Sequence, residues 1–409
     1  MLIANPRAAR TPYPDELRAL LSIEKAQQSR RWLSRWREIA SDATPLRDLP
    51  GLAETLQIAR FSVKDESARS PLGSFKALGA PAALVRQILR LHPGIDPQGV
   101  LAGRYADRLK NYTVVSATDG NHGRGLAAAA RDAGCRCVIV LHANVGKERE
   151  KAIAAYGARI VRIAGNYDES VQEAARLSAT HDWQVVADTS YEGYEDIPRD
   201  VMQGYGAIAA EIVEQTAVRP GAAGAYTHIV LQGGVGGMAA GLISYLWEHQ
   251  GANRPRFIVV EPAQADCLMQ SAIQGRPAKA TGSVDSIMAG LACGETSPLA
   301  WRFLETSVDH FATIEDEEAI EAMRVLAQGS DKDIPIVAGE SGVAGLAALR
   351  RLRGDAALSA QAGLDAQSRV LIINTEGATA PSVFEQLVGA SADEILQRQR
   401  QFSRKNHVR

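Results

Sequence analysis

The sequence predicts an α/β fold built on mostly parallel sheets, and three observations lead to it. Short runs of β-branched and other apolar residues alternate with helical patterns along most of the 409 residues, which is the order of strand and helix in such folds. Several runs are apolar throughout, as strands are when helices cover both faces of a sheet. Gly134 and Gly157 each stand between a helical pattern and the next strand, where helices commonly end.

The strands are expected in regular order along the chain, each as a short apolar run. They cover residues 58–63, 113–117, 136–141, 159–164, 184–188, 227–232, 256–261 and 369–374. Helical patterns over residues 122–134, 169–181 and 238–249 fill gaps between these strands. A chain of this length is expected to form two or three lobes with a large buried core.

The composition excludes several classes of protein. The formal net charge of −2 argues against nucleic acid or an anionic membrane as the main partner. No apolar run is long enough to span a bilayer, and the first residues lack the apolar stretch of a secretory signal, so a cytoplasmic location is expected. The four cysteines are interpreted as reduced thiols, because no His-rich or Cys-rich partner completes a metal site.

Lys76 is the strongest candidate for covalent chemistry. It lies in PLGSFKALGA, between Ser74-Phe75 and Gly79, at an apolar helix start. Desolvation there is expected to lower its pKa and to make the neutral amine available as a nucleophile. Such a lysine can form a Schiff base with the aldehyde cofactor pyridoxal phosphate (PLP).

A glycine-rich turn follows the strand at residues 227–232 and leads into the helix at 238–249. A strand, a glycine turn and a helix together present backbone N–H groups at the positive end of a helix dipole, where a phosphate binds. Missing side chains let the backbone come close to a ligand. A tight turn without a ligand is the plainer interpretation. The turn consists of Gly233, Gly234, Val235, Gly236 and Gly237.

The same turn also fits a rival interpretation as a dinucleotide site. Gly234-x-Gly236-x-x-Ala239 matches the NAD fingerprint, and Glu261 ends the next strand at about the expected distance. This alternative gives no function to Lys76 or to the loop after residue 117.

That loop, within SATDGNHGRG, is a second candidate anion site. Thr118 and the following N–H groups open a helix at about His122 and suit a substrate carboxylate. Asp119 is either a helix N-cap or an acid–base group beside the reacting carbon. Asn121 can donate to a ring oxygen of a cofactor, whereas His122 is interpreted mainly as a structural hydrogen-bonding residue.

Two further side chains follow predicted strands. Asp188 ends the strand at residues 184–188, on the side where open α/β sheets bind ligands. Thr375 follows the strand at 369–374, and its hydroxyl could meet a pyridine nitrogen without forcing a proton onto it. For Asp188, a role in a cap or turn is the alternative.

At this point the chain resembles a known family. Its motifs occur in the order of the PLP enzymes of the tryptophan-synthase-β fold (fold type II), and within that fold the chain resembles the diaminopropionate ammonia-lyases. The related serine/threonine dehydratases usually carry Arg where this chain has Leu78, and Ser where it has Asp119. The resemblance rests on PLGSFKALGA, SATDGNHGRG, DTSYEGYEDIP with VMQGYG, LQGGVGGMAAG, IMAGLACGE, GESGVAGL and INTEGAT.

The resemblance implies an architecture. Two lobes, each with a mostly parallel twisted sheet covered by helices, would hold PLP in the cleft between them. Residues 1–76 and 188–409 would form the larger, PLP-binding lobe, and residues 77–187 a smaller inserted lobe. A homodimer acting on a small amino-acid substrate is also implied.

The resemblance also implies a reaction and the residues that perform it. Both enantiomers of 2,3-diaminopropionate would be converted to pyruvate and two ammonia molecules. Lys76 would hold PLP and take the α-proton of the L-isomer, and Asp119 would serve the D-isomer from the opposite face. The glycine turn would hold the phosphate, Asn121 the 3-oxygen and Thr375 the pyridine nitrogen. Independently, a substrate with a β-ammonium requires negative charge in its site, for which Asp119 and Asp188 are the candidates.

Three alternatives stay open. A serine/threonine dehydratase or an amino-acid racemase on the same scaffold is the nearest. A hydride-transferring oxidoreductase would rest on the glycine fingerprint and Glu261. A protein that holds PLP or senses amino acids without catalysis would bind ligand and release no pyruvate.

Overall fold

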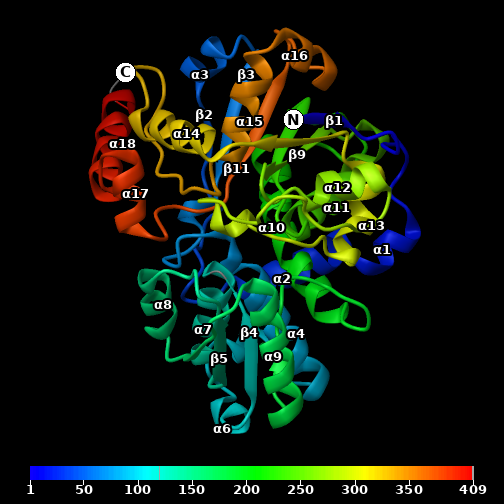
Figure 1. The fold of residues 1–409 in the computed structure, drawn as a ribbon, viewed down its shortest axis with the longest axis vertical. Helices are drawn as coiled ribbons and strands as arrows, with labels where there is room; N and C mark the ends of the chain where they lie inside the picture. The colour runs from blue at the N-terminus through cyan, green and yellow to red at the C-terminus, as the bar shows by residue number, and fades with distance from the viewer. Residues whose placement is uncertain (119, 408–409) are drawn as a thin grey trace.

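The computed structural model describes residues 1–118 and 120–407, whose strands form two separate sheets. The larger sheet lies in the upper half of Figure 1 and the smaller sheet in the lower half. Strands and helices alternate along most of the chain, which confirms the predicted α/β class.

The larger sheet is mostly parallel. The short edge strands β1 and β2 pair antiparallel with their neighbours, and the strands between them run parallel to one another. In spatial order the strands are β1 (Leu2–Ala4), β10 (His310–Ile314), β9 (Arg256–Pro262), β8 (His228–Gln232), β11 (Arg369–Asn374), β3 (Arg60–Asp65) and β2 (Leu46–Asp48).

The smaller sheet is parallel throughout. Its central strands, β5 and β4, are followed by helices that return the chain to the same edge of the sheet, as parallel pairing requires. In spatial order the strands are β6 (Arg159–Arg162), β5 (Arg136–Leu141), β4 (Thr113–Ala117) and β7 (Gln184–Val185).

Helices cover both sheets and connect them (Figure 1). The longest, α10, runs through the middle of the molecule and packs against α2, α4 and α11. The α-helices are α1 (Asp15–Leu20), α2 (Ile23–Leu33), α3 (Pro50–Thr55), α4 (Gly79–Leu91), α5 (Pro97–Val100), α6 (Ala106–Leu109), α7 (Asn121–Ala133), α8 (Lys147–Ala154), α9 (Tyr167–His181), α10 (Asp196–Thr216), α11 (Gly237–Gln250), α12 (Cys267–Gln274), α13 (Pro298–Ser307), α14 (Asp316–Gln328), α15 (Ala344–Arg353), α16 (Ala356–Ala362), α17 (Pro381–Val388) and α18 (Ala392–His407).

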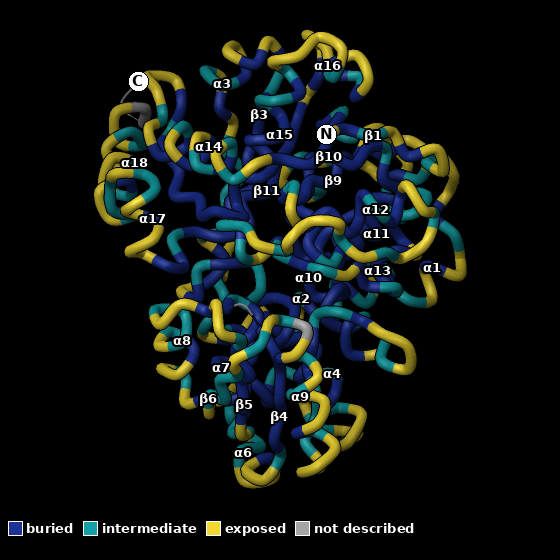
Figure 2. The backbone as a smooth tube through the Cα atoms, in the orientation of Figure 1, coloured by how far each residue is buried: buried dark blue, intermediate teal, exposed yellow. Residues whose placement is uncertain are grey.

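Successive residues of the central strands face opposite helical layers, as the pleat of a strand requires. In β8, Val230 belongs to the core beneath α14 and α15, whereas Ile229 and Leu231 belong to the core beneath α10 and α11. In the smaller sheet, Val115 packs toward α9 and Val114 toward the layer that contains α4 and α7. Figure 2 shows these strands buried under partly exposed helices, which explains why their sequences are apolar throughout.

The structure corrects some of the expected strands. β10 and the edge strands β1 and β2 were not predicted. The strand expected at residues 184–188 ends at Val185, because the Tyr194 hydroxyl donates to Val185 O at 2.9 Å and accepts from Ala187 N at 3.1 Å. These bonds occupy backbone groups that a longer strand would use.

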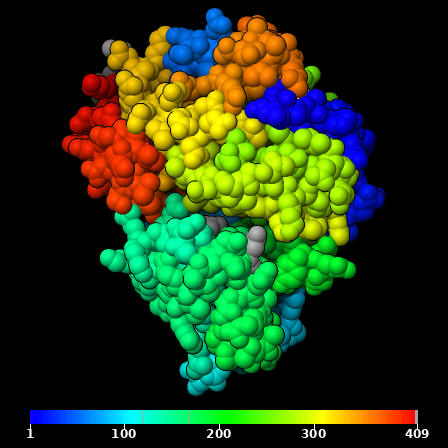
Figure 3. Space-filling model, in the orientation of Figure 1, coloured from blue at the N-terminus to red at the C-terminus, as the bar shows by residue number. Residues whose placement is uncertain are grey.

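The parallel strands of both sheets end toward the middle of the molecule, and loops that follow β4, β8 and β11 lie there. Figure 3 shows the smaller lobe, cyan to green, meeting the larger one along a seam. Within residues 1–118 and 120–407, no helix is long and apolar enough to cross a membrane. The same residues include no cluster of three or more His, Cys, Asp or Glu side chains arranged to hold a metal ion.

Candidate active site

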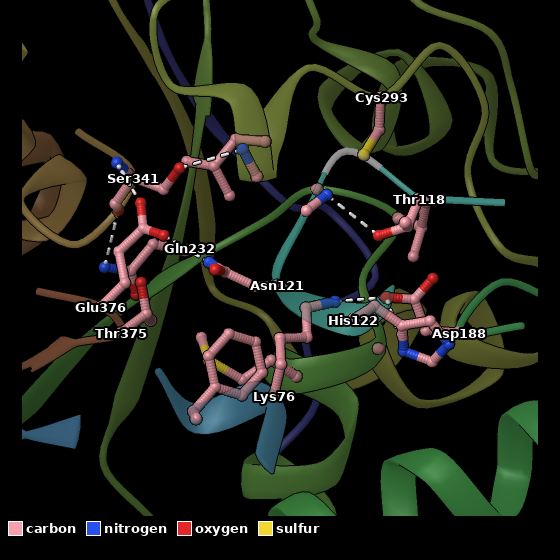
Figure 4. Close-up of a pocket in the computed structure, with 18 of the residues that line it drawn as sticks. Lys76, Thr118, Asn121, His122, Asp188, Gln232, Cys293, Ser341, Thr375 and Glu376 are labelled. Carbon is pink, nitrogen blue, oxygen red and sulfur yellow. Dashed lines mark hydrogen bonds and ion pairs between the residues drawn. The ribbon is translucent and has the colours of Figure 1, made fainter. Parts of the chain in front are cut away.

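A pocket lies where the two lobes meet, and segments of both lobes line it (Figure 4). The structure brings together in it nearly all the site residues that the sequence predicts. Gly236 is not among the lining residues, and Asp119 lies outside the described residues. The predicted residues that line the pocket are Lys76, Thr118, Asn121, Asp188, Gly233, Gly234, Val235, Gly237 and Thr375.

Lys76 lies on a single helical turn, Phe75–Ala77, that is fixed to the larger sheet because Phe75 N donates to Thr375 O at 3.0 Å. Its side chain is 19% exposed, and its Nζ forms an ion pair with Asp188. Burial lowers the pKa of Lys76, but the Asp188 carboxylate together with Tyr205 and other neighbours raises it by more, so the pKa is raised overall. The expectation of a lowered pKa was therefore wrong, because a carboxylate lies beside the amine.

Asp188 lies between two side chains that can carry a proton. It accepts from Lys76, and its Oδ2 is 3.7 Å from Nδ1 of His122. Burial raises the pKa of Asp188, but the Lys76 ammonium more than offsets it, so the carboxyl is ionised. His122 Nε2 is 2.8 Å from Val186 O, which accepts, so Nε2 carries a hydrogen. Burial holds the pKa of His122 below its ordinary value, and the imidazole is neutral.

The loop after β4 is organised around a threonine. The Thr118 hydroxyl accepts from Gly120 N at 3.0 Å and from Gly123 N at 3.1 Å, so it satisfies amides at the start of α7. Helix α7 begins at Asn121, one residue before the predicted start. The N-terminus of α7 therefore points into the pocket, where its dipole favours an anion.

The glycine turn has the backbone geometry that the sequence suggested. Gly234 has φ +59° and Gly236 has φ +99°, which favour glycine at both positions. A Cβ on Gly233 would lie 2.7 Å from Glu261 Cγ, and one on Gly236 would lie 2.9 Å from Leu304 Cδ1. Close packing behind the turn therefore excludes side chains as firmly as the backbone angles do.

The front of the turn is equipped to bind an anion. In the part of the chain that the structure describes, the amides of Gly234, Val235 and Gly237 have no hydrogen-bond partner. They lie at the N-terminus of α11, which begins at Gly237 and runs for 14 residues. Unpaired amides at a helix N-terminus suit a phosphate group.

Glu261, on which the dinucleotide interpretation depends, does not face the pocket. It is fully buried, and its carboxyl group accepts from Leu268 N and Met269 N, each at 2.8 Å. Burial raises its pKa to about 8. Because these oxygens are committed to the start of α12, they are unavailable to a ribose hydroxyl.

Thr375 and Asn121 face each other across the pocket from different lobes (Figure 4). Thr375 is buried at the end of β11. Asn121 Nδ2 donates to Glu376 Oε2 at 2.5 Å, a contact that the sequence did not predict.

Several lining residues were missed. The ring centroids of Tyr205 and Phe75 are 4.8 Å apart, and Lys76 Nζ lies 5.9 Å from the Tyr205 centroid. Arg149 lies on α8, and its guanidinium nitrogen is 3.9 Å from a carboxyl oxygen of Glu340 in the larger lobe. The stretches VMQGYG, GESGVAGL and INTEGAT contain Tyr205, Glu340 and Glu376, so their motifs were visible. Arg149 carries no such signal.

Comparison with known proteins accounts for this arrangement. The sequence model of the family described as "Pyridoxal-phosphate dependent enzyme" matches residues 39–376. Diaminopropionate ammonia-lyase of Salmonella typhimurium is 37% identical over 355 residues, which cover 84% of this chain and 87% of that protein. The chain belongs to the diaminopropionate ammonia-lyase family of PLP-dependent enzymes.

Two further comparisons show how similar this chain is to a solved structure of the family and to a related dehydratase. The crystal structure of Escherichia coli diaminopropionate ammonia-lyase in complex with an aminoacrylate-PLP azomethine reaction intermediate matches with a TM-score of 0.83 and 34% identity, covering 95% of this chain and 96% of that one. L-Threonine dehydratase of Haemophilus influenzae is 26% identical, and the match covers 76% of this chain but 53% of that protein. The fold type II architecture predicted from the motifs is confirmed.

The residues present fit the family cofactor. The pocket contains a lysine amine, a turn with unpaired amides at a helix N-terminus, and the threonine that follows β11. Side chains at Gly233 and Gly236 would be too close to their neighbours for the turn to keep this shape. PLP needs these three kinds of group for its aldehyde, its phosphate and its pyridine nitrogen.

Proposed function

We propose that this protein converts 2,3-diaminopropionate, in both enantiomers, to pyruvate and two ammonia molecules by PLP-dependent elimination. The single observation that carries this proposal is the Lys76–Asp188 ion pair beside the glycine turn. It joins a candidate nucleophile to a carboxylate that can receive a second positive charge. The relatives named diaminopropionate ammonia-lyase support the same choice of substrate.

Lys76 would hold the cofactor aldehyde through Nζ, and the turn of Gly233, Gly234, Val235, Gly236 and Gly237 would surround its phosphate, with the unpaired amides of Gly234, Val235 and Gly237 donating to it. Asn121 would contact the 3-oxygen and Thr375 the pyridine nitrogen. When bound, PLP supplies an electron sink that stabilises negative charge at the α-carbon of an attached amino acid.

Proton transfer is assigned to two residues. The Lys76 amine, once released from the cofactor, removes the α-proton of the L-isomer. Asp119 removes the α-proton of the D-isomer from the opposite face. A positioned side chain of this kind contributes roughly 10²–10⁴-fold to a rate, so the loss of either base should be easy to measure.

Substrate binding is assigned to Thr118 and Asp188. The loop at Thr118 and the N-terminus of α7 attract the substrate carboxylate. Asp188 pairs with Lys76 in this structure and would pair with the β-ammonium of the substrate in turn. The β-ammonium already carries its extra proton, so it can depart as neutral ammonia while its bonding electrons stay with the nitrogen.

The test combines spectroscopy with turnover. The purified protein should be yellow or become so with PLP, and it should release pyruvate from each enantiomer of 2,3-diaminopropionate, as measured with lactate dehydrogenase. L-Serine, D-serine and L-threonine serve as comparison substrates. Turnover of serine or threonine far above that of diaminopropionate would replace the proposal with a dehydratase, and binding without pyruvate would leave a non-catalytic protein.

The division of the chain into residues 1–76 with 188–409 and an inserted lobe of 77–187 is part of the same proposal. It is supported by the strands of the smaller sheet, β4 to β7, which all fall between residues 113 and 185. Limited proteolysis should first cut in loops within or beside residues 77–187, and a first cut through β8 or β11 would contradict the division.

A cytoplasmic location and a homodimer are further expectations of the proposal. The location rests on the sequence pattern, and the homodimer rests on the family resemblance. Light scattering after size-exclusion chromatography should give twice the chain mass of 43.8 kDa. A mass that stays at one chain over a wide concentration range would remove the dimer.

A further inference from the structure

Glu376 contacts Asn121 across the interface of the two lobes. Asn121 is the first residue of α7, beside the smaller sheet, and Glu376 follows β11 of the larger sheet. The bond from Asn121 Nδ2 to Glu376 Oε2 measures 2.5 Å, and both residues line the pocket that contains Lys76. Glu376 has no role in the proposed reaction as described so far.

Glu376 is held firmly at both its side chain and its backbone. Its side chain is buried at 4% exposure, Oε1 accepts from Ser341 N at 3.1 Å, and Oε2 also accepts from Thr379 Oγ1 at 3.3 Å. Its carbonyl accepts from Gly339 N at 2.9 Å. The carboxylate therefore has a fixed position before any ligand arrives.

Glu376 lies beside a second buried carboxyl group. Glu340, 2% exposed, is the adjacent buried carboxyl, and burial followed by the charge of Glu376 raises the pKa of Glu340. Glu340 therefore takes up a proton more readily than an ordinary glutamate, whereas Glu376 accepts hydrogen bonds at both of its carboxylate oxygens. Arg149, 3.9 Å from Glu340, supplies the positive charge on the opposite wall.

A fixed carboxylate determines which way the Asn121 amide faces. A carboxylate only accepts hydrogen bonds, so Nδ2 must face Glu376 and Oδ1 must turn away from it. A flipped amide would set two acceptors against each other beside the buried Glu376 carboxylate, which is costly. The second hydrogen on Nδ2 is then available in one direction only.

We propose that Glu376 is a positioning residue that fixes the Asn121 amide for its contact with the 3-oxygen of PLP. The inference rests on the proposed function for the identity of the cofactor contact, and it adds the residue that enforces it. It predicts that Glu376 acts on the cofactor through Asn121 and makes no independent contribution.

The experiment is a double-mutant cycle on cofactor binding. PLP is titrated into apoprotein of the parent, Glu376→Gln, Asn121→Ala and the double variant, and binding is followed by visible absorbance. We expect Glu376→Gln and Asn121→Ala each to raise the PLP dissociation constant by about tenfold, as loss of a bond to a charged group does. The double variant should bind no more weakly than Asn121→Ala alone.

A second readout is the pH titration of the visible band, which should shift in Glu376→Gln. Glu54→Gln is the matched control, because it removes the charge of an exposed glutamate that pairs with Lys332 outside the pocket, and it should leave both readouts unchanged. Urea unfolding of each apoprotein separates loss of folding from loss of positioning.

Fully additive losses in the double variant, or parent-like binding and titration by Glu376→Gln, would overturn the positioning role. A parent protein that binds PLP but releases no pyruvate from diaminopropionate would overturn the proposed function. The double-mutant cycle would still test the role of Glu376, because it measures PLP binding alone. A parent that binds no PLP would overturn both.

Discussion

Lys76 and Asp188 form an ion pair inside the pocket, where their side chains are 19% and 14% exposed. The pair raises the pKa of the lysine and lowers that of the aspartate, in each case against the effect of burial. A buried charge without its partner is costly, so whatever displaces Lys76 from Asp188 must bring a positive charge of its own. A substrate with two ammonium groups meets that requirement.

Asp188→Asn should therefore discriminate between substrates. We expect kcat/KM for 2,3-diaminopropionate to fall by about 100-fold, since removing one partner of a buried charge pair costs roughly 2–5 kcal/mol. L-Serine lacks the β-ammonium and should lose much less. Asp182→Asn, at an exposed position, is the control. Equal losses on both substrates would remove Asp188 from recognition of the β-ammonium.

Lys76→Ala should abolish covalent attachment of the cofactor and nearly all elimination. We expect activity to fall by about 10³-fold or more, because the same residue supplies the attachment and a base. Borohydride reduction followed by peptide mass spectrometry should label Lys76 in the parent protein only. Lys151→Ala, on the exposed face of α8, should keep both label and activity. A label on another lysine would overturn the assignment.

The sequence could predict what is local. Strands apolar throughout, such as β4, β8 and β11, and the polar residues directly after them were found because adjacent sequence specifies both. β10 was missed because polar residues interrupt its pattern, and β1 exists only through pairing with it, for example Leu2 with Ala312. Three-residue edge strands have too little pattern to detect.

Contacts between distant segments could not be predicted. Asn121 and Glu376 are 255 residues apart, and only the packing of one lobe on the other brings them together. The raised pKa of Lys76 was missed for the same reason, since Asp188 is 112 residues away. Motifs marked these residues as important, but a motif does not state which side chain faces which.

Asp119→Asn tests the second base. We expect activity on the D-isomer of diaminopropionate to fall by about 10²-fold or more, as loss of a general base does, and activity on the L-isomer to fall much less. Initial rates of pyruvate release on each pure enantiomer provide the measurement. Equal losses on the two isomers would remove the two-base scheme.

Glu340→Gln tests the buried carboxyl pair through the pH dependence of stability. Burial and the charge of Glu376 raise the pKa of Glu340 above its ordinary value of 4.5. The folded protein therefore holds a proton that the unfolded chain releases, and stability falls as pH rises from that value to the higher folded pKa. The variant cannot ionise and should escape this loss.

The stability difference between Glu340→Gln and the parent should therefore grow in favour of the variant from about pH 5 to about pH 8, by roughly 1–3 kcal/mol. Urea unfolding of the apoproteins at several pH values measures it, and titrating groups that do not interact with Glu340 cancel in the difference. Glu54→Gln, at an exposed ion pair with Lys332, should show little change. A difference that stays constant with pH would contradict a raised pKa at Glu340.

Gly236→Ala tests the glycine turn. Gly236 has φ +99°, and a Cβ there would lie 2.9 Å from Leu304 and 3.0 Å from Ala300. Gly221 has φ +73° and nothing within 4 Å of its Cβ position, so Gly221→Ala carries the backbone strain alone. That strain costs about 1 kcal/mol.

We expect both variants to lose this stability in urea unfolding. Gly236→Ala should lose about 1–3 kcal/mol more than Gly221→Ala, because it also overpacks the core. Only Gly236→Ala should bind PLP more weakly, since the turn must shift to admit the methyl group. If both variants bound PLP like the parent, the shape of the turn would not matter for the cofactor.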